Sequence, residues 1–491
     1  MMKEFYSKII PTPKYTNYDK ENKYTVIRGI VTNQAEWAPA VDAFCDYIDR
    51  AFNVSLRKNE DIEIALDNSL ADGKYRIETA DTVKIFARSL SGVNYALSTL
   101  WQLIYKKDGR LYAPCVSITD YPECNYRGLM VDLARQWHPF ENLLFYADLC
   151  WALKINRLQL HFSDQQSYTL PSNEYPKLNR PYRFYAKEQI DRLNAYAAAR
   201  SVSIVPEIDL PGHAKTIIDA YPQYFSNDIT LSETIKADTA VCIGQRDIFK
   251  NLEKLIDEVI QLFPDSKLIH IGGDEVDHRI WEACPRCRDY MDKNGLTDSG
   301  ALYTHVVKTL TDIVLKKGRT PVVWEGFDKS GAESISKEVI VMAWECYYNL
   351  PPDLIESGFN IVNCSWKPLY IVPEDKEIDG KKVMEWDEYD ILKWNIYAWQ
   401  NFWKESAAYV SPINISPTSQ VLGGQLCAWE DDFNGEMRCI KTHLAALSER
   451  TWTVEHKMTD KELKTALKLL LPKINALMRY NKIREKLNEI I

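Results

Sequence analysis

Short apolar runs alternate with longer amphipathic segments through most of this chain. The apolar runs have the length of buried β-strands and lie at 128–134, 156–162, 203–208, 268–272, 320–324, 340–344, 359–363 and 424–429. Between most of them apolar residues recur at helical spacing, at 141–154, 187–200, 247–263, 301–317 and 435–450. Eight strand–helix units predict an α/β fold, a TIM (β/α)8 barrel, whose site follows the carboxyl ends of the strands. A doubly wound open sheet is the alternative, but its glycine-rich phosphate loop is missing from the sequence.

The ends of the chain follow other patterns. Residues 1–120 show strand-like alternation at 62–64 and 83–87, a turn at Gly73 and a helix-like run at 92–105, which predicts a small N-terminal α/β domain. The Tyr121-Pro122 pair marks its boundary with the barrel, predicted at 121–455. Residues 456–491 form a C-terminal helical extension, an amphipathic helix from Asp460 that we expect Pro472 to interrupt. It serves as a packing helix or a dimer helix, so the protein is a monomer or a homodimer.

Composition narrows the function. The chain has 491 residues, of which 46% are hydrophobic, and a net charge of −9 from 60 basic and 69 acidic residues. No basic stripe is present, so nucleic acid and anionic membrane surfaces are not expected partners. The N-terminus has no apolar signal core and no apolar run reaches the roughly 18 residues of a membrane span, which predicts a cytoplasmic protein. A trimmed secreted form would have the same features.

Eleven cysteines, an odd number, fit reduced thiols better than a disulfide framework. Only the Cys284-Pro-Arg-Cys287 pair has a regular spacing. Zinc needs about four ligands, and the sequence has no second CxxC or HxxxH motif to complete a site. We therefore interpret the pair as a local loop feature and predict no metal.

The run Leu268 to Glu275 is the most informative segment. It is a buried strand that ends in two glycines and then two adjacent carboxylates, Asp274 and Glu275. The glycines let the chain bend, so both carboxylates can reach one ligand, and one can raise the pKa of the other. An acidic loop after a core strand is the alternative for this segment taken alone.

Other predicted strands also end in polar or aromatic residues. These are Arg127 and Asp132; His161 and Asp164; Glu207, Asp209 and His213; Trp324 and Glu325; Trp344 and Glu345; Tyr370, after the seventh strand; and Trp429, Glu430 and Asp431. Indole rings stack on sugar rings, while carboxylates and arginine bind hydroxyl groups. Singly, each tryptophan could be core, Arg127 a structural ion pair and each histidine an interior one. Their recurrence at one end of the barrel favours a carbohydrate site.

Four motifs resemble the β-N-acetylhexosaminidases of glycoside hydrolase family 20. They are Arg127-Gly-Leu-Met-Val-Asp132, Asn156-Arg-Leu-Gln-Leu-His161 with Asp164, Pro206-Glu-Ile-Asp-Leu-Pro-Gly-His213 and His270-Ile-Gly-Gly-Asp-Glu275. The stretch 83–103 is similar to the end of the small domain that precedes the barrel in that family. The resemblance covers most of the chain.

The resemblance implies an exo-acting, retaining hydrolase of terminal β-linked N-acetylglucosamine or N-acetylgalactosamine. The acetamido oxygen of the substrate would attack C1 and give an oxazolinium intermediate, an exception to the two-carboxylate scheme. Glu275 would be the general acid and base, and Asp274 would orient the acetamido N–H. No metal or organic cofactor is implied.

The resemblance also implies roles for the residues around the dyad. Arg127 would bind O3 and O4, and Tyr370 the acetamido carbonyl. Asp164 and Asp431 would contact substrate, and Trp324, Trp344 and Trp429 would line the site. Asp209 and His213 would form a relay that tunes Glu275. His161 and His270 would belong to the same layer of residues, which supports the dyad without touching the substrate.

Departures from the family pattern lie near the sugar O4 and O6. After Tyr370 comes Ile371-Val372, where a carboxylate is common; Glu430 and Asp431 both follow Trp429; and Gln165 follows Asp164 where an aspartate is common. We hypothesise tolerance of a 6-substituted or 6-sulfated sugar, or of an altered O4 configuration. A two-carboxylate glycosidase with Glu325 or Glu345 as nucleophile and a non-catalytic sugar-binding barrel remain alternatives.

Overall fold

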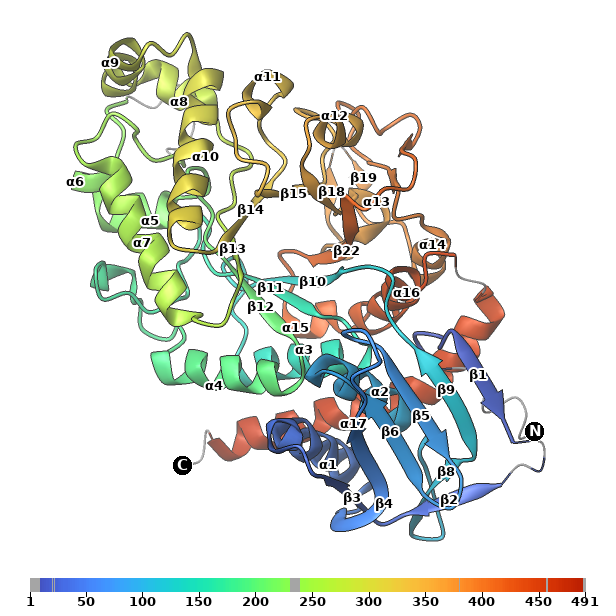
Figure 1. The fold of residues 1–491 in the computed structure, drawn as a ribbon. Coiled ribbons are helices and arrows are strands. Elements are labelled where there is room, and N and C mark those ends of the chain that lie inside the picture. The colour runs from blue at the N-terminus through green and yellow to red at the C-terminus, as the bar shows by residue number, and fades with distance from the viewer. Residues whose placement is uncertain are drawn as a thin grey trace.

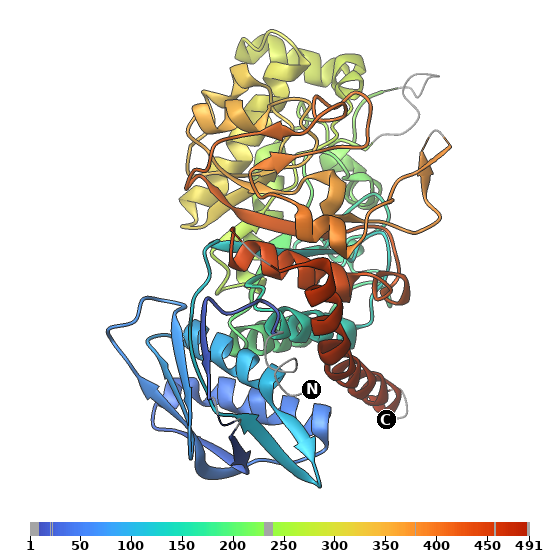
Figure 2. The same ribbon diagram turned by 90° about the vertical axis from the view of Figure 1, so that its right-hand side faces the viewer.

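A closed barrel and a smaller sheet domain lie next to one another in the molecule (Figure 1). The computed structural model describes residues 9–19, 21, 23–229, 239–378, 380–455 and 458–488. The small domain comes first in the chain, and the last helix returns to it after the barrel is complete (Figure 2).

Eight parallel strands of the described chain form the barrel. They are β10 (Tyr126–Asp132), β11 (Arg157–His161), β12 (Ser203–Glu207), β13 (Leu268–His270), β14 (Thr320–Trp324), β15 (Ile340–Ala343), β16 (Asn360–Asn363) and β22 (Val421–Ala428). The first strand pairs in parallel with the last, from Tyr126 with Gly423 to Val131 with Ala428, which closes the sheet. The predicted TIM barrel is therefore confirmed, and the open sheet is wrong. A short strand, β17 (Tyr370–Ile371), pairs with the end of β22.

The barrel strands are apolar on both faces because helices cover their outer side. Every residue of β10 is buried, as expected for a parallel strand between two layers. Alternate residues of neighbouring strands form an inner apolar cluster that includes Met130, Val322, Met342 and Val362. This inner cluster continues into the aromatic side chains of the candidate site.

The helices that follow the barrel strands include α3 (Phe140–Ala152), α4 (Lys187–Ala199), α7 (Ile248–Leu262), α10 (Ser299–Lys316), α12 (Pro351–Glu356) and α16 (Ile440–Trp452). Shorter helices in the loops are η2 (Pro176–Leu178), α5 (Lys215–Ala220), α6 (Pro222–Phe225), α8 (His278–Ala283), α9 (Pro285–Asn294), α11 (Lys329–Ala332), α13 (Trp366–Leu369), α14 (Glu388–Lys393) and α15 (Phe433–Glu436). The single helix predicted at 435–450 is wrong in its first turn, because the chain forms α15, turns, and begins α16 at Ile440. Two small hairpins complete the barrel loops, β18 (Glu377–Ile378) with β19 (Lys381–Lys382) and β20 (Ala398–Trp399) with β21 (Ile413–Asn414).

The small domain is a six-stranded sheet with helices against it. Its order is β1 (Tyr15–Tyr18), β9 (Val116–Asp120), β5 (Tyr75–Thr79), β6 (Val83–Ala87), β4 (Arg57–Leu66) and β3 (Gly29–Thr32). A second sheet consists of β2 (Tyr24–Ile27), β8 (Arg110–Pro114) and β7 (Tyr105–Lys107). The helices are η1 (Ala35–Trp37), α1 (Ala38–Phe52) and α2 (Leu90–Leu103).

The last helix, α17 (Asp460–Asn488), runs between α3 of the barrel and α1 of the small domain (Figure 1). The predicted interruption at Pro472 is wrong, since the helix continues through it. The next residue, Lys473, extends its ammonium group to the carbonyl oxygens of Trp101, Gln102 and Ile104 at 2.7–2.9 Å. These are the last carbonyls of α2 and its C-cap, groups that have no partner inside the helix. The C-terminal helix therefore packs within the chain and completes the small domain.

Among the described residues, no helix has both the length and the apolar character needed to cross a membrane.

Candidate active site

The loop after β13 places Asp274 and Glu275 at the carboxyl end of the barrel. Gly272 has a φ of 71°, and a Cβ there would lie 1.8 Å from Asp209 Oδ1, so only glycine lets the loop pass this side chain. Asp274 is 8% exposed, whereas the side chain of Glu275 is 53% exposed. The two adjacent carboxylates therefore lie in different environments, one enclosed and one facing solvent.

Asp274 is a buried carboxyl group with an unused oxygen. Burial, together with the neighbouring charge of Asp209, raises the pKa of Asp274 well above its ordinary value. Its Oδ1 atom has no hydrogen-bond partner among the described residues. Because a buried acceptor without a donor is destabilising, this oxygen is suited to a donor group of a bound molecule.

Glu275 is paired with a histidine. His213 Nε2 lies 3.3 Å from Glu275 Oε2, and this hydrogen bond lowers the pKa of Glu275 despite its partial burial. Burial would lower the pKa of His213, but Asp209 and the hydrogen bonds to Asp164 and Glu275 outweigh it and raise the pKa well above the ordinary value. The free site therefore holds a charged histidine next to an ionised Glu275.

A continuous row of buried side chains extends from Glu275 into the barrel. We call His213, Asp164, His161 and Glu207 the relay. His213 Nδ1 lies 3.3 Å from Asp164 Oδ1, Asp164 Oδ2 lies 3.0 Å from His161 Nε2, and His161 Nδ1 lies 3.1 Å from Glu207 Oε2. The register explains the inner part, because His161 is the Cα partner of Glu207 in neighbouring strands.

The contacts of the relay change the roles predicted for Asp164 and Asp209. Asp164 was expected to contact substrate, but it is 1% exposed and binds two histidines and Arg135. The charge of Asp209 raises the pKa of His213, as the implied pairing of these two residues requires, but the hydrogen-bond partner of His213 is Asp164, while Asp209 Oδ1 accepts the N–H of Gly273 at 3.1 Å. Asp209 therefore shapes the loop that bears the dyad, while Asp164 holds His213.

Glu207 anchors the inner end of the relay. Burial would raise its pKa, but His270 and His161 outweigh this and lower the pKa to about 2. Trp324 Nε1 donates to Glu207 Oε1 at 2.7 Å, which fixes the indole. Burial lowers the pKa of His270 to about 4, so this histidine is neutral at pH 7 and accepts the N–H of Gly272 at 3.0 Å.

Four aromatic rings form a closed set at the barrel end, here called the aromatic box. They are Trp324, Trp344, Tyr370 and Trp429. Successive ring centroids lie 6.4, 6.2, 6.3 and 5.9 Å apart around the set. The structure thus brings together all four aromatic residues that the sequence selected. Trp366 on α13 stacks on the outer side of Tyr370 at 4.8 Å.

The prediction that Arg127 faces the sugar is wrong. Arg127 lies at the amino-terminal end of β10, and its guanidinium group donates to the carbonyls of Lys154 and Cys124 and to Tyr95. Arg135, three residues beyond the end of the strand, lies at the opposite end. It contacts Asp132 at 3.0 Å and Asp164 at 2.7 Å. Its guanidinium carbon lies 5.0 Å from the ring centre of Trp429, and its side chain is 19% exposed.

Asp431 and Glu430 follow the end of β22. Glu430 has a φ of 65° and pairs with Lys376 at 2.5 Å. Its N–H donates to Asp132 at 3.3 Å, which connects this loop to the loop of Arg135. Asp431 is half-buried, and burial raises its pKa.

The two carboxylates of the alternative mechanism have other environments. Glu325 is 1% exposed, and its oxygens accept N–H groups of the loop 346–349 at 2.8–3.1 Å. It therefore holds a loop in place. Glu345 is 7% exposed, and burial with the nearby charges of Glu325 and Glu275 raises its pKa to about 8. Glu345 is thus a neutral acid at pH 7.

Sequence reasoning missed three residues of this cluster, Arg135, Trp366 and Tyr303, and it assigned no role to Glu207. Tyr303, on α10, donates its hydroxyl to Gly273 O. The spacing Asp132-x-x-Arg135 just beyond a strand end was the available indication for Arg135. Tyr303 lies on a helix whose apolar spacing explains it as core, so no sequence pattern singles it out.

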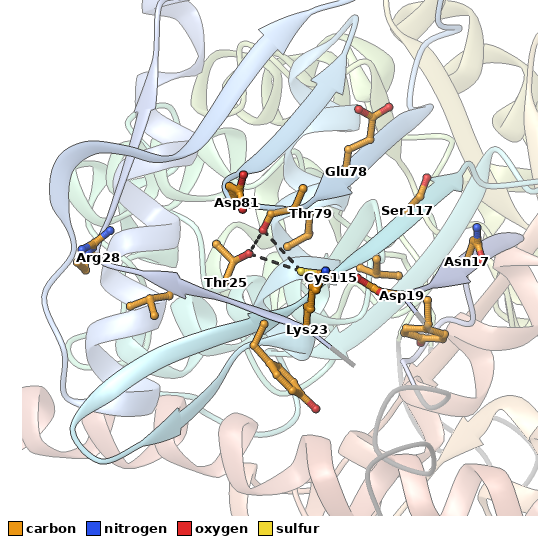
Figure 3. A pocket seen from close by; sticks show the side chains of 15 residues that line it. Asn17, Asp19, Lys23, Thr25, Arg28, Glu78, Thr79, Asp81, Cys115 and Ser117 are labelled. Carbon is orange, nitrogen blue, oxygen red and sulfur yellow. Dashed lines mark hydrogen bonds between the residues drawn. The ribbon is translucent and has the colours of Figure 1, made fainter. Parts of the chain in front are cut away.

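A cavity of about 720 Å³ opens in the small domain, away from this cluster (Figure 3). Lys23, Thr25, Asp81, Cys115 and Ser117 are among its lining residues, and none of the predicted site residues lines it. The candidate site is therefore defined by the side chains at the barrel end.

Two family models match this chain. The family description "Glycosyl hydrolase family 20, catalytic domain" matches residues 124–455, and "Glycosyl hydrolase family 20, domain 2" matches residues 6–121. A β-hexosaminidase of Akkermansia muciniphila is 34% identical over 313 residues, which are 60% of this chain and 62% of that protein. A β-hexosaminidase of Porphyromonas gingivalis is 30% identical over 284 residues, 53% of this chain and 36% of that protein. The chain thus aligns with about a third to two thirds of the length of these relatives.

Solved structures show the same fold. The exo-β-N-acetylglucosaminidase of Vibrio harveyi superposes with a TM-score of 0.82 at 22% identity, over 96% of this chain and 77% of that one. The β-N-acetylhexosaminidase of Bacteroides fragilis superposes with a TM-score of 0.79 at 23% identity, over 94% of each chain.

Proposed function

Because this chain belongs to glycosyl hydrolase family 20, we propose that it is an exo-acting β-N-acetylhexosaminidase that uses the acetamido group of its substrate as nucleophile. The substrates are terminal β-linked N-acetylglucosamine and N-acetylgalactosamine, and the product retains the β configuration. The observation that supports this proposal best is that Oδ1 of buried Asp274 has no partner within the described part of the chain and lies next to solvent-facing Glu275.

A protein nucleophile is the main alternative, and the structure argues against both candidates for it. The oxygens of Glu325 are occupied by backbone N–H groups. Glu345, with a pKa of about 8, is protonated at neutral pH and is then a poor nucleophile. The acetamido group of the sugar can supply the nucleophilic oxygen without either residue. The N–H of the same group is a donor for the Asp274 oxygen that has no partner among the described residues.

The protons of the free dyad have to be redistributed when the sugar binds. Burial raises the pKa of Asp274, and the hydrogen bond from His213 lowers that of Glu275, so the free pair holds its proton on Asp274. An acetamido N–H favours the ionised form of Asp274, while a sugar covering Glu275 removes water and favours its acid form. Binding therefore moves one proton from Asp274 to Glu275, which prepares the general acid.

The reaction then proceeds in two steps. In the first, the acetamido oxygen bonds to C1, the bond from C1 to the leaving oxygen breaks, and Glu275 gives that oxygen its proton. Ionised Asp274 stabilises the positive charge that develops on the acetamido nitrogen. In the second, Glu275 takes a proton from water, the water oxygen bonds to C1, and the oxazolinium ring opens. Both displacements occur at C1, so the β configuration is retained.

The remaining residues position the sugar. The aromatic box encloses the acetamido group, and the Tyr370 hydroxyl hydrogen-bonds its carbonyl oxygen, which aligns this oxygen with C1. Arg135, in the role first expected of Arg127, binds ring hydroxyls with the donors that Asp132 and Asp164 leave free. Asp431 supplies a further acceptor at the rim.

The loop after Tyr370 supports tolerance of a substituent on O6. Val372 is buried and presents no carboxylate. Lys376, four residues further on, is paired with Glu430 beside Trp429. Removal of a negative charge lowers the repulsion that a 6-sulfate would meet. We expect 6-sulfated N-acetylglucosamine to be hydrolysed with a smaller loss of kcat/KM than in a family member with a carboxylate at this position.

Matched aryl glycosides test the proposed mechanism. The β-N-acetylglucosaminide and the plain β-glucoside with the same leaving group differ only in the acetamido arm, so turnover of the first alone is expected. Product formation followed by NMR should show the β anomer first. Equal turnover of both glycosides would contradict the proposal, and so would binding of N-acetylglucosamine in a calorimeter without hydrolysis of any N-acetylhexosaminide.

A further inference from the structure

Three cysteines from two separate parts of the chain meet beside α9. Cys284 is the N-cap of this helix, Cys287 lies in its first turn, and Cys242 comes from the loop before α7. Cys242 Sγ lies 3.6 Å from Cys284 Sγ and 3.6 Å from Cys287 Sγ, and all three sulfur atoms lie within 4.8 Å of one another. All three side chains are fully buried. The Cys284/Cys287 pair is therefore part of a larger cluster, not only a local loop feature.

The sulfur spacing fits a metal ion better than a disulfide. A disulfide needs a sulfur–sulfur distance of about 2.05 Å and would leave the third thiol without a role. In a tetrahedral zinc site with Zn–S bonds of about 2.3 Å, the sulfur atoms lie about 3.8 Å apart. The measured 3.6 Å separations are close to that edge length.

The backbone around the three cysteines packs closely and places donor groups beside their sulfur atoms. A Cβ on Gly244 would lie 2.1 Å from the carbonyl oxygen of Arg286, so glycine lets the Cys242 loop pack directly against the CxxC turn. The N–H of Asp228 donates to Cys284 Sγ at 3.5 Å. The Arg286 guanidinium group lies beside Cys242 and donates to Ser226 O at 2.8 Å. A cation and an N–H donor both favour the thiolate form, which is the form that binds metal.

The side chain of Asn227 places an oxygen atom next to the cluster. Asn227 Oδ1 lies 3.6 Å from Cys287 Sγ, on the segment between α6 and the cluster. The same segment binds the Cys242 loop through the N–H of Cys242, which donates to Phe225 O at 2.8 Å. Three sulfur donors fill three of the four positions of a zinc site, and Asn227 Oδ1, beside Cys287, is a neighbouring oxygen for the fourth.

From this geometry we propose that Cys242, Cys284 and Cys287 bind one zinc ion, with Asn227 Oδ1 or a water molecule as fourth ligand. Binding displaces three thiol protons to solvent and leaves a complex with one negative charge beside Arg286. Zinc keeps its oxidation state, so no redox partner is involved.

The position of the cluster gives the ion a structural role. Cys242 is next to Val241, whose N–H donates to Pro211 O and whose carbonyl accepts the indole N–H of Trp281 on α8. Pro211 precedes His213 by two residues, and α8 begins three residues after Glu275. Figure 1 shows α8 and α9 together at one edge of the barrel. The ion would therefore join the segment that bears His213 to the segment that bears Glu275.

Metal content of the purified full-length chain tests the proposal directly. Elemental analysis should find one zinc per chain after gel filtration without chelator, and Cys242→Ser, Cys284→Ser and Cys287→Ser should each lose it. Cys115→Ser is the matched control, because Cys115 is buried in the small domain away from the cluster, and it should keep the zinc. Asn227→Ala should keep zinc if water fills the fourth position and bind it more weakly if the side chain does.

Wild-type measurements keep the test valid if the serine variants do not fold. Cobalt should replace zinc and give thiolate charge-transfer bands together with the strong visible bands of a tetrahedral site. A mercurial reagent should release the ion in proportion to the thiols it blocks. The proposal is overturned if the zinc-supplemented wild type holds no metal and binds no cobalt, or if mass spectrometry finds a disulfide within the cluster.

Discussion

His213 and Glu275 face each other at 3.3 Å, and both have a left-handed backbone, with φ of 47° and 49°. Non-glycine residues rarely adopt this conformation, and where it occurs the surrounding structure has to enforce it. The two strained residues belong to different loops, one after β12 and one after β13. Their contact joins the relay to the only solvent-facing carboxylate of the Asp274–Glu275 dyad.

Replacing His213 with Gln is expected to change both rate and pH dependence. The hydrogen bond from His213 lowers the pKa of Glu275, so its loss raises that pKa and keeps Glu275 protonated to higher pH. The basic limb of the kcat/KM profile should move upward, while kcat falls by roughly 10- to 100-fold as the acid loses its alignment. His305→Gln, in a half-buried histidine on α10, should leave the profile unchanged. An unshifted limb in the His213 variant would show that the contact does not act on Glu275.

The two carboxylates of the dyad should respond differently to the leaving group. Glu275→Gln removes the acid, so turnover of an unactivated disaccharide should fall by about 10²- to 10⁴-fold, while a dinitrophenyl glycoside, which needs little protonation, should lose much less. Asp274→Asn removes the stabilisation of the oxazolinium ion and should slow both substrates to a similar extent. Steady-state kinetics on the two substrates separate these outcomes, and a uniform loss in the Glu275 variant would argue against its role as acid.

Substitution of Arg135 should lower catalytic efficiency, whereas substitution of Arg127 should lower folding stability alone. Arg135→Met should lower kcat/KM by on the order of 10- to 100-fold, because one charge-assisted hydrogen bond to a sugar is worth roughly 1.5–3 kcal/mol, and it should also lower Tm, because buried Asp132 and Asp164 lose a cationic partner. Arg127→Met leaves the carbonyls of Lys154 and Cys124 without their donor inside the protein, so it should lower the free energy of unfolding by several kcal/mol. Kinetics and thermal unfolding of both variants make the comparison. A normal kcat/KM in the Arg135 variant would remove it from the sugar site.

Glu345 offers a direct test of the two-carboxylate mechanism. Its pKa of about 8 makes it a neutral acid below neutral pH, and glutamine has nearly the same shape. Glu345→Gln should therefore keep its activity at about pH 6, where the native side chain already carries no charge. An enzyme that needed Glu345 as nucleophile would instead lose turnover at every pH, and azide would restore it.

Glu449 should make folding stability depend on pH. It accepts the N–H of Thr12 at 2.7 Å, and burial raises its pKa from 4.5 to about 7. The folded state holds this proton more tightly than the unfolded state, so the added stability is complete below about pH 4.5 and is lost as pH rises through about 7. The shift corresponds to about 3 kcal/mol.

Glu449→Gln keeps the acceptor and cannot ionise. The Tm of this variant should exceed that of the wild type at about pH 8.5, and the difference should shrink toward pH 5. Comparing the two proteins at each pH cancels the contribution of every other titrating group. A Tm difference that is constant from pH 5 to 8.5 would mean that Glu449 does not titrate in this range.

The sequence predicted all eight barrel strands because parallel strands are apolar on both faces and form continuous runs. The errors lie at the strand ends, where hydrogen-bond pairing and not composition decides the limit. The first strand was predicted at 128–134 but pairs over Tyr126–Asp132. Arg127 enters the candidate site through the family resemblance alone, because even the predicted strand 128–134 places Arg127 at its amino-terminal end and Arg135 directly after its carboxyl end.

Contacts between distant segments could not be predicted. The choice between Asp164 and Asp209 as partner of His213 depends on how two loops turn after their strands, and both residues lie in recognisable motifs. Cys242 is 42 residues from Cys284, with α7 and β13 between them. A search for regular cysteine spacing therefore finds Cys284 and Cys287 but not the third thiol.

The contact of Lys473 with the end of α2 has a consequence for the order in which the protein is completed during synthesis. The carbonyls of Trp101, Gln102 and Ile104 leave the ribosome about 370 residues before the ammonium group that binds them. Until then the face of the small domain that α17 covers is open to solvent. The nascent small domain therefore reaches its final form only after the barrel has been translated.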